Sequence, residues 1–253
     1  MRLLSIVVPA YNEEAYLGKL LERIAAVDTR KLGFEKEVIV VNDGSRDRTE
    51  EIARSFERRG VACLNQVPNQ GKGRAVRRGI TEARGEYILI QDADLEYDPA
   101  DYLPMLAALL QADAVYGSRT LGQFRQGRGW PTPGRHPQQR VGPWFAGVLL
   151  SCWTCLLYGR WISDTLTAYK LYPAAVLKDL TLETNGFETD HEITAKLIRE
   201  RLRITEVPIS YYPRSAEEGK KIKPRDGLVA VWTLLRFRWG TYKSRPQGQP
   251  QKG

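Results

Sequence analysis

The first half of this 253-residue chain alternates short apolar runs with segments of helical periodicity, and this alternation limits the possible folds most strongly. The runs of strand type are residues 3–8, 37–41, 61–64, 86–90 and 113–116. The helical patterns between them cover residues 13–26, 48–59, 73–83 and 98–110. Repeated strand–helix–strand units with short links predict an α/β fold, in which a mostly parallel sheet has helices on both faces.

The alternation becomes irregular after residue 117. Residues 117–139 are rich in Gly, Pro and Arg, so we expect a mobile loop there. Residues 241–253 are rich in Pro, Gln and Gly and are expected to be a disordered tail. The chain is therefore expected to form one domain over residues 1–240, with halves at 1–117 and 118–240.

Two apolar segments in the second half allow several interpretations. Residues 141–159 carry no charge and reach the ~18–20 residues that a bilayer span needs. The segment is flanked by Arg140 and Arg160, and it could span a membrane, lie partly in the membrane interface, or form a core helix. Residues 227–240 mix Val, Leu and Trp with Arg236 and Arg238, which is typical of an interfacial helix and equally of a packing helix with a basic end.

The overall charge favours an anionic partner. The chain has 38 Lys and Arg against 30 Asp and Glu, which gives a net charge of +8. Nucleic acid, a phospholipid surface and a phosphorylated substrate all fit this balance. Three cysteines exclude a disulfide scaffold, and the first residues lack the layout of a signal peptide, so a cytoplasmic location is expected.

Polar or acidic residues follow three of the predicted strands. They are residues 9–13 (PAYNE), 42–45 (NDGS) and 92–96 (DADLE). Ligands of open α/β sheets bind outside the carboxyl ends of the strands. The three groups are therefore expected to meet at one edge of the sheet, where they form the candidate site.

Three carboxylates lie two residues apart at Asp92, Asp94 and Glu96. In an extended chain they would point to one side, where their repulsion needs a counter-charge. A divalent cation meets that need, and oxygen ligands favour Mg²⁺ or Mn²⁺. The alternative is a solvated acidic turn.

Basic residues accompany the acidic ones. Residues 69–74 (NQGKGR) precede a predicted helix, whose N-terminus favours anions. Residues 211–223 contain Arg214, Lys220 and Lys221 around Gly219. This segment is either a solvated basic loop or a flexible clamp for a diphosphate, with Arg providing bidentate contacts.

Five motifs in order resemble the family-2 glycosyltransferases, which have the GT-A (Rossmann-like) fold. They are VVPAYNEE (7–14), VNDGSRDRT (41–49), NQGKGRAVRRGI (69–80), QDADLE (91–96) and YGSR (116–119). Residues 162–172, 186–197 and 206–227 look specifically like the dolichyl- or polyprenyl-phosphate mannosyl- and glucosyltransferases. The similarity covers residues 3–239.

The resemblance implies a role for each matching residue. Nucleotide-sugar contacts would come from Pro9, Ala10, Tyr11, Glu13, Asp43, Lys72, Asp92, Ala93, Asp94, Arg214, Lys220 and Lys221. The metal ligands would be Asp92, Asp94 and Glu96, and the acceptor phosphate would contact Arg119 and Arg140. Asp94, Arg119 and Asp164 are the expected catalytic residues; Asp164 either acts directly or only orients the acceptor or a basic residue.

The reaction implied by the resemblance is an inverting transfer of a hexose from GDP-mannose or UDP-glucose to a polyprenyl phosphate. Residues 1–117 would bind the nucleotide sugar, and residues 118–240 the acceptor and the membrane interface. Many relatives carry two to four C-terminal transmembrane helices, whereas this chain has one amphipathic segment. It is therefore expected to be peripheral on the cytoplasmic face of an anionic membrane, or to use a separate membrane subunit.

Three other functions predict different sequences. A sugar-nucleotide pyrophosphorylase should have a Gly-rich loop after the first strand, where this chain has PAYNE. A nucleic-acid-binding module should cluster Lys and Arg with stacking aromatic residues, whereas here the basic residues lie near acidic strand ends and apolar helices. No nucleic-acid partner is therefore expected. A glycosyltransferase with a soluble sugar or protein acceptor stays open.

Overall fold

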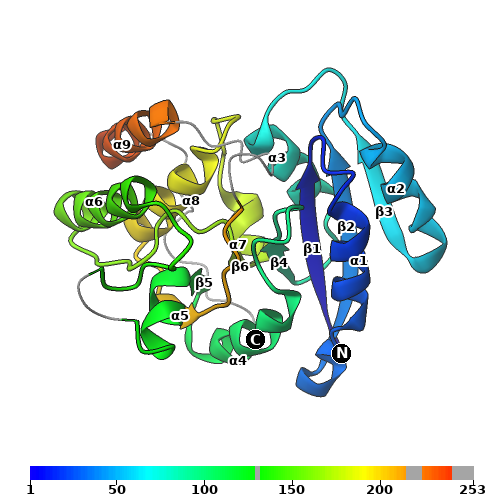
Figure 1. Cartoon of the computed structure of the whole chain (residues 1–253), viewed down its shortest axis with the longest axis horizontal. Helices are drawn as coiled ribbons and strands as arrows, with labels where there is room; N and C mark the ends of the chain where they lie inside the picture. Colours follow the sequence, from blue (N-terminus) through cyan, green and yellow to red (C-terminus); the bar gives the residue numbers. More distant parts are fainter. Residues whose placement is uncertain (129–131, 215–223, 241–253) are drawn as a thin grey trace.

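In the computed structural model, which describes residues 1–128, 132–214 and 224–240, a seven-stranded sheet forms the centre of the molecule (Figure 1). Its strand order is β3-β2-β1-β4-β6-β5-β7. The strands are β1 (Arg2–Ala10), β2 (Phe34–Asn42), β3 (Val61–Asn65), β4 (Tyr87–Ile90), β5 (Ala114–Ser118), β6 (Lys170–Pro173) and β7 (Ile204–Pro208). Strand β6 runs antiparallel to β4 and β5, and the other pairs are parallel. The predicted mostly parallel sheet is confirmed.

Helices cover both faces of the sheet, as the alternation predicts. Side chains of β1 alternate between the two cores, with Leu4, Ile6 and Val8 on one face and Val7 on the other. The first face is covered by α1 (Leu17–Ala26), α2 (Thr49–Ser55) and α4 (Tyr102–Ala108). The second is covered by α3 (Lys72–Glu82), α7 (Ala174–Asp179) and α8 (Thr189–Arg199). Short 3-10 helices are η1 (Thr29–Leu32), η2 (Glu57–Arg59), η3 (Pro99–Asp101) and η4 (Leu109–Gln111).

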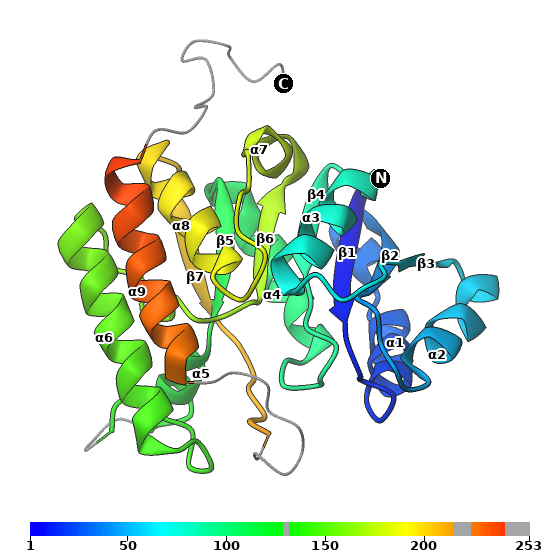
Figure 2. The same cartoon turned by 90° about the horizontal axis from the view of Figure 1, so that it is seen from above.

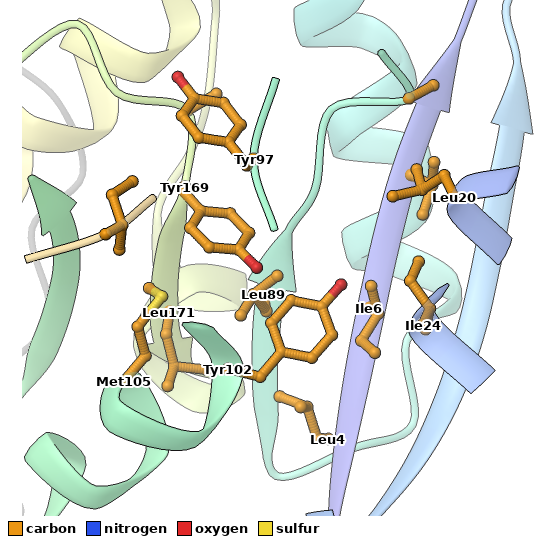
Figure 3. Packing of buried hydrophobic residues seen from close by; sticks show 14 of the residues in the cluster. Leu4, Ile6, Leu20, Ile24, Leu89, Tyr97, Tyr102, Met105, Tyr169 and Leu171 are labelled. Carbon is orange, nitrogen blue, oxygen red and sulfur yellow. The ribbon is translucent and has the colours of Figure 1, made fainter. Parts of the chain in front are cut away.

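Aromatic rings fill the first core next to the end of β4. The rings of Tyr97 and Tyr169 lie face to face, with centroids 5.1 Å apart (Figure 3). The hydroxyl of Tyr102 donates a hydrogen bond of 2.9 Å to Oε1 of Gln91. This packing anchors both ends of the segment that carries the three predicted carboxylates.

Two further helices, α6 (Val141–Tyr158) and α9 (Pro224–Trp239), lie beside α8 at one end of the molecule (Figure 2). They pack through a separate small core of Leu150, Ala195, Ala230, Leu234 and Phe237. Helix α6 is long and apolar enough to cross a membrane by length and composition, and only 17% of it is buried. The alternative of an ordinary core helix is therefore wrong for α6.

The prediction of a loop at residues 117–139 is wrong for its first part, because helix α5 (Arg119–Arg125) forms there. The side chain of Ser118 caps this helix, because its Oγ accepts a hydrogen bond of 3.0 Å from the amide of Leu121. A Cβ added to Gly122 would lie 2.0 Å from the carbonyl oxygen of Ile209. A glycine that looks like a loop signal thus serves a close approach between α5 and the chain after β7.

Candidate active site

Strands β2 and β3 lie on one side of β1, and the chain then returns to place β4 on the other side. The direction in which strands are added to the sheet therefore reverses between β1 and β4. The carboxyl ends of both strands, with residues 9–13 and 91–96, therefore share one edge of the sheet. Pro9 and Ala10 are the last residues of β1 and pair with Val41 and Asn42 of β2. The structure brings the predicted strand-end residues to this edge.

The acidic segment after β4 turns sharply and does not stay extended, so that part of the prediction is wrong. Leu95 has a φ of 61°, and Oδ1 of Asp94 accepts a hydrogen bond of 3.1 Å from the amide of Glu96. Such a turn closed by an Asp side chain competes with an extended backbone. The described residues contain no group of three His, Cys, Asp or Glu side chains placed to hold one metal ion.

Two basic residues, Lys72 and Arg214, are the partners of the three carboxylates of this turn. Oδ1 of Asp92 lies 2.7 Å from Nζ of Lys72, and Oδ2 of Asp94 lies 2.7 Å from Nη2 of Arg214. Oε1 of Glu96 accepts a hydrogen bond of 2.9 Å from the amide of Arg214. The predicted acidic and basic residues thus meet in pairs; Lys220 and Lys221 lie outside the described residues.

Burial raises the pKa of Asp92 and of Asp94. The neighbouring carboxylates Asp94 and Glu96 raise these pKa values further, and Lys72 and Arg214 offset only part of the rise. A raised pKa means that the folded protein favours additional positive charge at these oxygens. The oxygen donors of Asp92 and Asp94 therefore fit a hard divalent cation such as Mg²⁺ or Mn²⁺.

Lys72 links the acidic turn to helix α8. It is the first residue of α3, and its Nζ also lies 3.4 Å from Oδ2 of Asp190. Burial lowers the pKa of Lys72, but Asp92 and Asp190 raise that pKa by more, so the ammonium stays charged. Asp190 lies in the first turn of α8, so its contact with Lys72 connects this helix to the site.

Asp43 organises the Gly-rich segment before α3. Its Oδ1 accepts hydrogen bonds from Nε2 of Gln66 at 2.6 Å and from the amide of Gln70 at 2.8 Å. Its Oδ2 accepts a hydrogen bond of 2.8 Å from the amide of Gly71. Gly71 has a φ of 95°, which favours glycine, and its place immediately before Lys72 directs α3 toward the site.

Arg119 and Asp164 form a buried ion pair at the carboxyl end of β5. Nε and Nη2 of Arg119 each lie 2.7 Å from the carboxylate, and the Arg119 amide donates a third hydrogen bond of 3.0 Å. Burial raises the pKa of Asp164, but Arg119 lowers it by more, so the net pKa is below its usual range. Arg140, at the start of α6, is exposed and does not contact this pair.

The chain after β7 joins the two charged groups into one site. The ring of Tyr211 lies 5.0 Å from Cζ of Arg119. One residue later, the Tyr212 amide donates a hydrogen bond of 2.9 Å to the carbonyl oxygen of Glu96. Arg214 then reaches Asp94. Residues 209–214 therefore run from the Arg119–Asp164 pair to the acidic turn.

Sequence reasoning missed Lys170, which lies under this site at the start of β6. Its Nζ is fully buried, 3.2 Å from the carbonyl oxygen of Asp190 and 3.3 Å from Oγ1 of Thr194. Burial lowers the pKa of Lys170 to about 8. A single lysine within the apolar run AYKLY was the available signal.

The buried His191, which follows Asp190 in α8, is expected to make the folded protein less stable in acid. The side chain is buried, its Nδ1 has no hydrogen-bond partner among the described residues, and burial lowers its pKa to about 4. Between pH 6.5 and 4 the unfolded state binds the proton more readily, so stability is present above that window and is lost as the pH falls. We expect wild-type protein to lose about 2 kcal/mol more than His191→Gln between pH 7 and 5. Urea unfolding at both pH values measures this; equal losses would contradict it.

Comparison with known proteins assigns this chain to a family. The model of glycosyl transferase family 2 matches residues 5–160, which is more than half of the chain. A dolichyl-phosphate beta-glucosyltransferase of Trichomonas vaginalis is 29% identical over 251 residues, covering 92% of this chain and 72% of that protein. An undecaprenyl-phosphate 4-deoxy-4-formamido-L-arabinose transferase of Pseudomonas paraeruginosa is 34% identical over 174 residues, covering 66% of this chain and 50% of that protein.

A solved structure supports the same fold. Glucosyl-3-phosphoglycerate synthase of Mycobacterium tuberculosis, in complex with Mn²⁺, uridine diphosphate and phosphoglyceric acid, superposes with a TM-score of 0.67. Its sequence identity is 22%, and the match covers 96% of this chain and 80% of that one. Because the family model matches more than half of the chain and the site lies at the strand ends of this fold, the chain belongs to glycosyl transferase family 2.

Proposed function

We propose that this glycosyltransferase moves a hexose from a nucleotide diphosphate sugar to a polyprenyl phosphate, with inversion at the anomeric carbon. The observation that carries this proposal is the joining of an acidic turn and a buried Arg–Asp pair into one site by residues 209–214. The acidic turn with its basic partners suits a cation and a diphosphate, and the Arg119–Asp164 pair suits a phosphate. The named substrates of the two lipid-phosphate relatives support this acceptor class.

On the donor side, residues at the ends of β1, β2 and β4 would hold the nucleotide sugar. Mg²⁺ or Mn²⁺ bound by Asp92 and Asp94 would supply positive charge to the departing diphosphate. Glu96 would join as a further ligand only after its side chain has moved, because the described residues bring no three such side chains together. Lys72 holds Asp92 in place, and Arg214, which lies beside Asp94, would contact the diphosphate in a bidentate manner.

On the acceptor side, the phosphate is itself the nucleophile. A phosphate monoester with a second pKa of ~6 is largely dianionic at pH 7, so its attack needs no strong base. Arg119 would bind this phosphate, and Arg140 would add a second contact. Both oxygens of Asp164 are engaged with Arg119, so Asp164 positions the guanidinium. Attack from the face opposite the diphosphate gives the inverted product.

A membrane surface would supply the acceptor. Large apolar side chains are exposed along α6 and α9: Val141, Phe145, Leu149, Leu156, Leu228, Val229, Val231, Trp232 and Trp239. Arg140 and Arg160 flank α6, and Arg236 and Arg238 end α9. Exposed apolar and basic residues on one helix pair suit an anionic lipid interface. We propose peripheral binding at the cytoplasmic face, alone or with a membrane subunit.

Replacing two of these side chains should weaken membrane binding. Leu228 and Trp232 are 75% and 62% exposed, so Leu228→Ser combined with Trp232→Ser removes apolar contact without opening the core. We expect at least a tenfold loss of partitioning into anionic vesicles, since each such side chain contributes roughly 1.5–3 kcal/mol on burial. Vesicle co-sedimentation measures it, with the exposed Leu32→Ser as control. Unchanged partitioning would refute the membrane role of α9.

The direct test of function is a donor and acceptor panel. UDP-glucose, GDP-mannose and UDP-N-acetylglucosamine are incubated with Mn²⁺ or Mg²⁺ and a short polyprenyl phosphate, and labelled sugar is counted in the lipid phase. The unphosphorylated polyprenol and soluble 3-phosphoglycerate are the comparison acceptors. We expect product only with polyprenyl phosphate. Transfer to 3-phosphoglycerate alone would overturn the lipid acceptor and support the soluble one.

A further inference from the structure

The guanidinium of Arg214 occupies the position of a counter-ion among three carboxylates. Its Nη1 lies 3.2 Å from Oε2 of Glu13, its Nη2 lies 2.7 Å from Oδ2 of Asp94, and its Nε lies 3.9 Å from Oε1 of Glu96. The Arg214 side chain is only 10% exposed. Its Cζ also lies 5.2 Å from the centre of the Tyr16 ring.

This contact blocks the residue that is proposed to hold the metal. Oδ2 of Asp94 faces the guanidinium, and Oδ1 of Asp94 accepts the Glu96 amide. A divalent cation at Asp94 would lie within a few ångströms of the guanidinium charge, where repulsion is strong. A cation can therefore bind Asp94 well only after Arg214 has moved.

A bound diphosphate would draw the guanidinium of Arg214 away from Asp94. Its Nε is buried and makes no hydrogen bond with any described residue, although an arginine has five donors in a planar fork. Diphosphate oxygens accept such a fork in the bidentate manner and so satisfy it. Lys72 differs, because it contacts Asp190 as well as Asp92 and can stay in place.

We propose that Arg214 makes the metal site selective for a metal–diphosphate complex over the free metal ion. The guanidinium competes with free metal for Asp94, and the diphosphate removes this competition by binding the guanidinium. By linkage, metal and nucleoside diphosphate must then strengthen each other's binding by the same factor. The inference rests on the proposed metal site and adds an order of binding to it.

The test measures Mn²⁺ binding without acceptor, so it does not depend on turnover. Free Mn²⁺ is followed by electron paramagnetic resonance, with and without UDP or GDP, and Mn²⁺ bound by the nucleotide in solution is measured separately and subtracted. For wild-type protein we expect the nucleotide to raise Mn²⁺ affinity at least tenfold. For Arg214→Gln we expect free Mn²⁺ to bind about tenfold more tightly than to wild type, and the nucleotide effect to fall to twofold or less.

Two further variants complete the design. Arg214→Lys keeps a charge but cannot bridge Glu13 and Asp94, so an intermediate Mn²⁺ affinity is expected. Arg48→Gln, whose side chain is 73% exposed and lies near Glu14, should bind Mn²⁺ as wild type does. Thermal melts show whether each variant is folded. If Arg214→Gln does not fold, the Mn²⁺ affinity of Arg214→Lys tests the inference in its place.

Unchanged or weaker binding of free Mn²⁺ to folded Arg214 variants would overturn the inference, even if lipid-linked sugar is made. Conversely, the expected binding pattern in a protein that makes no lipid product would support the inference and reject only the proposed acceptor. Absence of Mn²⁺ binding in the presence of nucleotide would overturn both this inference and the metal part of the proposed function.

Discussion

Asp94→Asn is expected to lower the rate of sugar transfer by about 10²–10³, the range seen when one electrostatic contact to a developing charge is lost. The amide keeps the shape of the side chain but removes the charge that would hold the cation. Thermal stability should stay the same or rise. Burial and the neighbouring Glu96 raise the pKa of Asp94, which means that the folded state carries an unfavourable negative charge there.

The matched control is Asp113→Asn. Asp113 immediately precedes β5 and pairs with Arg203 at the opposite end of the strand from Arg119, so its loss should leave transfer unchanged. Transfer assays and thermal melts on both variants separate a lost charge from a damaged fold. An Asp94→Asn variant within threefold of wild-type activity would refute the catalytic assignment.

Asp164→Ala is expected to lower the free energy of unfolding by about 3–5 kcal/mol, the usual effect of removing one partner of a buried ion pair. The side chains of Asp164 and Arg119 are 6% and 17% exposed, and three hydrogen bonds join the two residues. The substitution leaves Arg119 without its counter-ion and removes one of the two carboxylates, Asp164 and Asp190, whose charge acts on Lys170. Urea unfolding at pH 7 measures the loss.

A double variant distinguishes stability from function at this pair. Replacing Asp164 by Leu and Arg119 by Met removes both charges, and such apolar replacements of buried pairs are often close to neutral for stability. We expect the double variant to recover most of the lost stability while transfer to polyprenyl phosphate stays at least 100-fold low. Recovery of activity together with stability would show that Arg119 has no role at the acceptor phosphate.

The sequence predicted the frame of this fold because local patterns carry that information. Apolar runs predicted all five strands of the first half, and β1 and β2 each extend only a few residues beyond the predicted ranges. The rule that ligands bind at strand ends then placed Asp92, Asp94 and residues 9–13 at one edge. Resemblance added Arg119 and Asp164, and the structure shows that these two residues form a pair.

Strands β6 and β7 were harder to predict. Strand β6 has four residues and is inserted antiparallel between β4 and β5, which are close in the chain. Nothing in its composition specifies those partners.

Arg119 likewise begins a helix in a segment rich in Gly and Arg, because Ser118 caps this helix and Gly122 fits against Ile209.

The amino-acid sequence by itself determined the order of strands and helices in the first half, the polar character of the strand ends and the family. The tertiary structure alone decided which charges neutralise each other: Lys72 reaches Asp190 across 118 residues, and Arg214 reaches Asp94 across 120. Local patterns act over a turn or a strand, whereas such pairs depend on how the sheet is ordered. A charge in this site therefore acquires its partner, and its role, only when the chain has folded.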